Sequence, residues 1–136
     1  MTTQHMSYLI NIAQAAAENH FFRKVLFTGD KSQLVVMNIP AGEDIGQETH
    51  QHVEQILYFQ SGSGIAVLDG KESAISAGDV VIVKPGTQHN FINTGTEPLI
   101  VATVYVPPNH IDGTIHKTKA EALKDKQDES FGESVA

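Results

Sequence analysis

The sequence contains no cysteine. This absence excludes disulfide bonds, thiolate metal ligands and a cysteine nucleophile. Basic residues are also scarce, because 9 Lys and Arg stand against 16 Asp and Glu, which gives a formal net charge of −7. Contacts to nucleic acid phosphates need clustered Lys and Arg, so this charge balance argues against a nucleic-acid partner.

Long apolar runs are missing as well. No run approaches the ~20 apolar residues that a membrane-spanning helix needs, and the first residues lack the basic region and apolar run of a signal peptide. We therefore expect a cytoplasmic protein with no membrane partner. A length of 136 residues is typical of one domain with a core of its own, spanning 1–136.

The sequence does have many short apolar runs, each closed by turn residues. The run 34–39 ends at Pro40-Ala41-Gly42, and the run 65–68 meets Asp69-Gly70, a strong hairpin signal. Short strands at such regular spacing are typical of all-β sandwiches and barrels. The pattern predicts an all-β fold with a barrel core over about residues 25–107.

Both ends of the chain are expected to be helical. Residues 11–19 are rich in alanine and begin with Asn11, a good N-cap. Thr118 and Glu121 have the spacing of a capping box, which predicts a second helix over about residues 119–126. The acidic residues that follow predict a solvated, disordered tail after residue 127.

Histidines suggest the chemistry. His50 and His52 are two residues apart, and on a strand they would project from the same face. His89, on a later predicted strand, can complete the set. Imidazole suits zinc, iron, nickel and copper, so the pattern predicts a metal site inside a β-structure.

The order of residues around these histidines resembles the two motifs of the cupin superfamily. The residues that carry the resemblance, within roughly 34–106, are His50, His52, Gln55, Gly62, Gly78, Gly86, His89 and Asn93. The resemblance implies a jelly-roll barrel of the double-stranded β-helix type with short terminal helices, one bound divalent metal ion and a homodimer. Segments 22–26, 42–46 and 107–116 also resemble small single-domain cupins labelled mannose-6-phosphate isomerase-like.

The resemblance implies a metal-ligand set of His50, His52, Gln55 and His89. Gln55 stands where the family has a glutamate, and the spacing from His52 is one residue short, so Glu54 and Glu48 are alternatives. Neutral ligands alone would leave the ion its full charge and favour an anionic ligand, whereas a carboxylate would better support redox chemistry. The sequence does not distinguish zinc, iron, manganese and nickel.

Several apolar side chains share the parity of Gln55 and His89, and they are expected to wall the pocket or to pack in the core. The expected pocket residues are Leu57, Phe59 and Phe91, with Met37 on the opposing wall or in the core. Arg23 is interpreted as a surface or interface residue, with anchoring of an anionic substrate as the alternative. The segment 107–118 is expected to form a surface arm or an arm packed on a partner subunit, with a lid over the barrel opening as the alternative.

Three functions fit these observations. The first is a metal-dependent enzyme, of isomerase type, on a small and anionic molecule. The second is an iron-dependent dioxygenase, which the cupin resemblance permits. The third is a barrel that binds a small ligand without catalysis, because the sequence shows no general base beyond the metal-ligand set.

Overall fold

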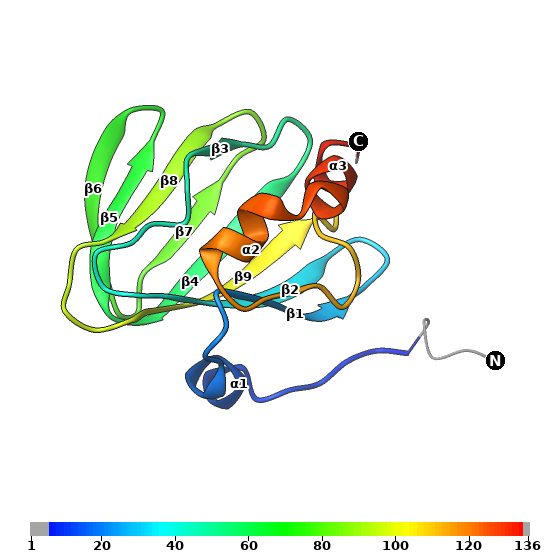
Figure 1. Cartoon of the computed structure of the whole chain (residues 1–136), viewed down its shortest axis with the longest axis horizontal. Coiled ribbons are helices and arrows are strands. Elements are labelled where there is room, and N and C mark those ends of the chain that lie inside the picture. The colour runs from blue at the N-terminus through cyan, green and yellow to red at the C-terminus, as the bar shows by residue number, and fades with distance from the viewer. Residues whose placement is uncertain (1–5, 135–136) are drawn as a thin grey trace.

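The structure is a computed structural model and describes residues 6–134. Two antiparallel sheets make up the protein (Figure 1). The six-stranded sheet has the order β10-β1-β2-β9-β4-β7, and the four-stranded sheet has the order β3-β8-β5-β6. The strands are β1 (Arg23–Thr28), β2 (Gln33–Ile39), β3 (Glu48–Thr49), β4 (Glu54–Ser61), β5 (Ser63–Leu68), β6 (Lys71–Ser76), β7 (Val80–Val83), β8 (Gln88–Asn93), β9 (Leu99–Val106) and β10 (Ile115–His116). The expected jelly-roll, double-stranded β-helix fold is confirmed.

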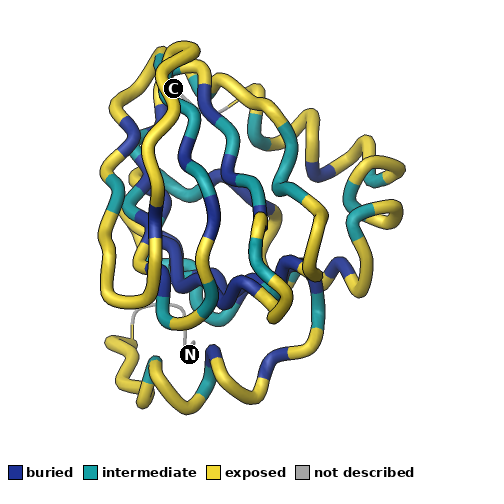
Figure 2. Tube along the Cα trace, turned by 90° about the vertical axis from the view of Figure 1, so that its left-hand side faces the viewer, coloured by how far each residue is buried: buried dark blue, intermediate teal, exposed yellow. Residues whose placement is uncertain are grey.

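The core lies between the two sheets. Side chains alternate along β4, where Gln55, Leu57 and Phe59 are buried and Tyr58 is exposed, as the period of a strand requires. Figure 2 shows buried and exposed positions in succession along the chain. The expected pocket residues all belong to one apolar core cluster. Leu57, Phe59 and Met37 are fully buried in it and Phe91 is nearly so, because a small barrel fills its interior with side chains. These four residues therefore serve as core packing and do not line the cavity described below.

Two glycines of the motifs meet a specific backbone demand. Gly62 has a φ of +95°, and a Cβ there would lie 2.7 Å from the carbonyl oxygen of Pro98. Gly86 has a φ of +85° in the turn before β8. L-residues with side chains rarely adopt this backbone region, so these positions need glycine for the turn or for close approach.

The N-terminal helix lies outside the barrel. Helix α1 (Ile12–Glu18) begins after Asn11, whose Oδ1 accepts a hydrogen bond from the Gln14 amide at 3.0 Å. It packs Ala16 on the outer face of the six-stranded sheet, with Val36 and Ala102, away from the two C-terminal helices (Figure 1).

The C-terminus differs from its prediction. Helix α2 (Lys119–Lys124) begins after the Thr118 cap as expected, but α3 (Lys126–Ser134) follows at once. The prediction of a disordered tail after residue 127 was wrong for residues 128–134, and residues 135–136 lie outside the described part of the chain. The acidic composition suggested solvation, but Asp128 is only 5 % exposed and binds the segment before β10.

The segment after β9 is fixed to the barrel by one buried side chain. Gln33 of β2 accepts hydrogen bonds from the amides of Asn109 and His110 at 3.1 and 3.0 Å. Its Nε2 donates to the His110 carbonyl oxygen at 2.8 Å. The chain then turns back through β10 into α2 and α3, which lie together on one side of the barrel (Figure 1). No helix among residues 6–134 is both long and apolar enough to cross a membrane.

Candidate functional site

A cavity of about 550 Å³ lies between the barrel and the C-terminal segment. The barrel side contributes residues 48–53 and Arg23, and the covering side contributes residues 109–110 and the helices α2 and α3. Ligand cavities of small molecules commonly measure about 300–1,000 Å³. The segment that the sequence predicts as an arm or lid is thus one wall of this cavity.

Glu48, His50 and His89 come together at the barrel side. One ligand atom from each lies within 4.8 Å of the other two. The pairing of β3 with β8 explains this, because it sets Glu48 directly opposite His89, and His50 follows one residue after β3 ends. The His50 and His89 ring centroids are 5.2 Å apart, and His50 Nε2 lies 3.8 Å from Glu48 Oε1.

His50 and His89 each have one ring nitrogen, Nε2, that is free to bind a metal ion. His89 Nδ1 lies 2.9 Å from the Thr87 carbonyl oxygen, so Nδ1–H donates and Nε2 is left as the acceptor. His50 Nε2 is buried and has no hydrogen-bond partner. Burial lowers the pKa of His50, although the nearby Glu48 carboxylate acts in the opposite direction. His50 is therefore neutral at neutral pH, which is the form that binds metal.

The other expected ligands lie in different surroundings. Residues 50–53 lie between strands, with a bend at 51–52, so the two-residue parity of a strand does not apply. His52 is exposed and lies outside the group of three. Gln55 points inward, donates to Thr103 Oγ1 at 3.1 Å and leaves its buried Oε1 without a partner. Glu54 has the opposite parity and is half-buried.

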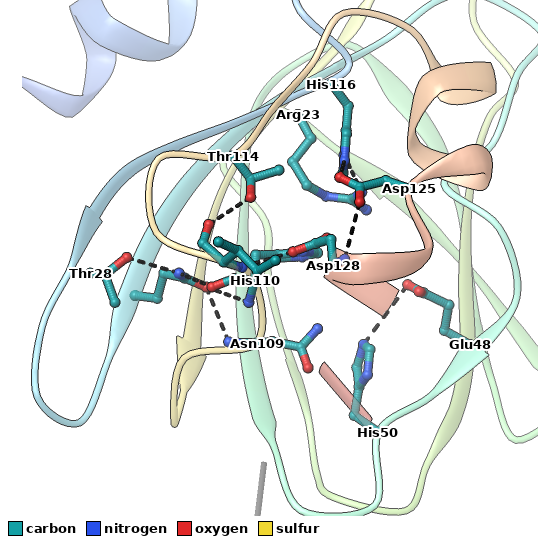
Figure 3. Close-up of polar contacts among 12 residues, drawn as sticks. Arg23, Thr28, Glu48, His50, Asn109, His110, Thr114, His116, Asp125 and Asp128 are labelled. Atoms are coloured by element: carbon teal, nitrogen blue, oxygen red, sulfur yellow. Dashed lines mark hydrogen bonds and ion pairs between the residues drawn. The ribbon is translucent and has the colours of Figure 1, made fainter. Parts of the chain in front are cut away.

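His110 is a polar residue of the cavity to which the sequence assigned no role. Its Nδ1 lies 2.7 Å from Asp128 Oδ2, so Nδ1–H donates to the carboxylate and Nε2 carries the lone pair (Figure 3). That Nε2 is buried without a partner. Burial lowers the pKa of His110, while Asp128 opposes the shift. The only sequence signal was the histidine in the Pro-rich segment after the barrel.

Tyr105 connects His110 to the metal-ligand group. Its ring packs edge-on against His110, with centroids 5.0 Å apart, and against His50 at 6.2 Å. Burial raises the pKa of Tyr105 to about 12, so its hydroxyl stays protonated. His110 is thus a neighbour of the group and not a member of it.

Arg23 is buried, against its interpretation as a surface or interface residue, with only 6 % of its surface exposed. Its Nη1 donates to His116 Nδ1 at 3.1 Å, and His116 Nε2–H in turn donates to Asp125 Oδ2 at 2.9 Å (Figure 3). His116, Asp125 and Asp128 also lie close enough to hold a cation. Hydrogen bonds already use both His116 nitrogens and all four carboxylate oxygens, which makes this group a structural network.

Comparison with known proteins agrees with this architecture. A protein of unknown function from Bacillus subtilis, YrkC, is 38 % identical over 85 % of this chain, which spans 66 % of that protein. The structure of BH2720 from Bacillus halodurans superposes with a TM-score of 0.84 and 36 % identity, covering 85 % of this chain and 92 % of that chain. The oxalate-binding protein of Thermotoga maritima is 33 % identical over 52 % of this chain and 58 % of its own length.

The family itself follows from the sequence match. Residues 35–118, which form most of the barrel and the start of its cover, match the cupin domain family. The double-stranded β-helix, the motif glycines and the paired histidines at one end of the barrel agree with that match. The chain belongs to the cupin family.

Proposed function

We propose that this cupin binds one divalent metal ion through Glu48, His50 and His89, with the amide oxygen of Gln55 as a further ligand. Support comes from the convergence of three ligand atoms within 4.8 Å and from two buried atoms without partners, His50 Nε2 and Gln55 Oε1. Buried polar atoms in proteins nearly always have partners, and an ion is one way to supply them. Imidazole and carboxylate ligands suit zinc, iron and manganese alike.

The activity we propose is isomerase-type chemistry on a small anionic molecule. A bound metal ion would polarise a carbonyl or hydroxyl oxygen of the ligand as a Lewis acid. The observation that carries this proposal is the His110–Asp128 pair on the opposite wall of the same cavity. A buried neutral imidazole held by a carboxylate is suited to accept and return a proton. The oxalate-binding relative supports a carboxylate as the anionic group.

An iron-dependent dioxygenase is the second candidate. The specific observation in its favour is the donor set, because two imidazoles and one carboxylate are the ligands of many non-haem iron oxygenases. The identity of the metal and oxygen consumption in the presence of substrate separate the two activities. A barrel that binds its ligand without turnover is the third reading, and it predicts no product with any metal.

The test is the metal content of protein purified without metal-affinity resin. We expect one ion per chain in the parent and a substoichiometric amount in the double variant His50→Ala with His89→Ala. His52→Ala is the matched control, because His52 is an exposed imidazole two residues from His50. Circular dichroism shows whether each variant is folded. A folded double variant that holds metal as well as the parent would refute the site.

A further inference from the structure

Four buried side-chain atoms around the cavity have no hydrogen-bond partner. They are Arg23 Nε, His50 Nε2, Asn109 Oδ1 and His110 Nε2. Native proteins leave few buried polar atoms unpaired, and each one calls for an explanation. The proposed metal ion accounts for His50 alone. The other three belong to one stretch of the cavity wall, where Asn109 and His110 are adjacent and Arg23 is near enough to His110 to affect its pKa.

Arg23 is the only arginine of the chain. No carboxylate lies within 4.0 Å of its guanidinium in the part of the chain that the structure describes. The guanidinium instead contacts neutral groups, which are Nδ1 of His116, the hydroxyl of Tyr105 and the face of the Phe22 ring. The carboxylates nearby, Asp125 and Asp128, already accept hydrogen bonds on both oxygens. A buried, permanently charged group without a partnered anion is costly, and an oxyanion in the cavity would remove that cost.

The neighbouring residues His110 and Asn109 present hydrogen-bond acceptors to the cavity and therefore need donors. His110 Nε2 carries a lone pair because Asp128 holds the proton on Nδ1. Asn109 is 5 % exposed, and its side-chain oxygen can only accept. One end of the cavity therefore combines a donor of fixed positive charge with two acceptors. A ligand satisfies all three when it carries an oxyanion and neighbouring hydroxyl groups.

We propose that Arg23, Asn109 and His110 form a binding site for a small hydroxylated oxyanion, a sugar acid or a sugar phosphate, beside the metal-ligand group. Arg23 binds the oxyanion, while His110 and Asn109 accept hydrogen bonds from hydroxyl groups. This inference deepens the proposed function and rests on it for the ion that also faces the ligand. A cavity of about 550 Å³ has room for a molecule of this class.

Four probes test the class of ligand by calorimetric titration of the metal-loaded protein. Gluconate has a carboxylate and hydroxyl groups, glycerol 3-phosphate has a phosphate and hydroxyl groups, hexanoate has only the carboxylate, and sorbitol has only hydroxyl groups. We expect one of the first two to bind at least about tenfold more tightly than both hexanoate and sorbitol. The tighter of the two identifies carboxylate or phosphate as the source of the oxyanion. Hexanoate or sorbitol binding as tightly as both hydroxylated anions would overturn the proposal.

Variants assign the contacts. We expect Arg23→Gln to lose about tenfold or more in affinity for the tighter probe, and Lys126→Gln, a charge change at an exposed position on the same cavity, to lose little. Arg23→Lys keeps the charge but not the planar fork, and it should also bind more weakly than the parent. Equal affinities of Arg23→Lys and the parent, or of Arg23→Gln and Lys126→Gln, would overturn the role of Arg23.

Asn109→Ala supplies a second measurement that does not depend on a buried charge. The hydrogen bond of the Asn109 amide to Gln33 remains in this variant. Asn109→Ala should lower the affinity for the hydroxylated probe and leave the affinity for hexanoate unchanged. A merely structural defect would not produce this difference. Metal analysis after each titration separates the two proposals. If the parent takes up no metal, the proposed function is refuted. The role of Arg23 is then tested by comparing the affinities of Arg23→Gln and Lys126→Gln in the metal-free protein.

Discussion

Asp128→Asn is the most informative single change, because it keeps the shape of the side chain and removes its charge. In the parent, Asp128 accepts from His110 Nδ1 at 2.7 Å and from the Ile111 amide at 2.8 Å. An amide can accept with its oxygen only. It would keep the bond to Ile111 and turn its NH₂ toward His110, which then has to accept on Nδ1 and carry its proton on Nε2. The atom that faces the cavity thus changes from acceptor to donor.

The loss of this charge-assisted hydrogen bond sets the expected magnitude. Hydrogen bonds to charged groups contribute about 1.5–3 kcal/mol, so we expect the free energy of unfolding to fall by about 2 kcal/mol at pH 7. Burial raises the pKa of Asp128, but the hydrogen bonds from His110 and the Ile111 amide, together with the nearby charge of Arg23, outweigh burial and hold the pKa below its usual value. The stabilisation is therefore present above the unfolded pKa of about 3.9 and is lost as the pH falls through the folded pKa.

The assay combines urea unfolding at pH 7 and pH 3 with nitrogen-15 NMR of the histidine tautomers. Glu129→Gln is the control, because Glu129 is an exposed neighbour on α3 whose carboxylate pairs with exposed Lys126 at 3.4 Å. We expect the free energy of unfolding of this control to differ from that of the parent by less than about 0.5 kcal/mol. If His110 carries its proton on Nε2 already in the parent, or if Asp128→Asn and the control unfold alike at pH 7, the assignment of the His110–Asp128 pair is wrong.

Two further predictions concern the fourth ligand and the assembly. Gln55→Glu should retain the metal and change the metal affinity, because Gln55 points inward. Glu54→Gln should leave the metal affinity unchanged, because Glu54 has the opposite parity. A metal titration that shows the reverse would exchange the two roles. We also expect a homodimer that buries the exposed apolar face of β7, where Ile82 is 56 % exposed. Ile82→Lys should then sediment as a monomer, whereas Ile115→Lys, at the opposite edge of the same sheet, should not; a monomeric parent at micromolar concentration would contradict this.

Local patterns determined the barrel. Alternation along β4, the Asn11 cap of α1 and the turn glycines each depend on a few neighbouring residues, so the sequence alone predicts them. The motif histidines His50 and His89 were likewise recognisable, because their spacing to the turn glycines Gly62 and Gly86 is set over short stretches of the chain.

Only the tertiary structure decided which side chains share the cavity. The pairing of β3 with β8 sets Glu48 beside His89, and the bend after β3 turns His52 away, neither of which follows from sequence spacing. Asp128 lies in a stretch with the composition of a solvated tail. It is nevertheless buried, because His110, 18 residues earlier, donates a hydrogen bond to its carboxylate. Such pairs depend on how separate segments of the chain meet in space, and no local pattern encodes them.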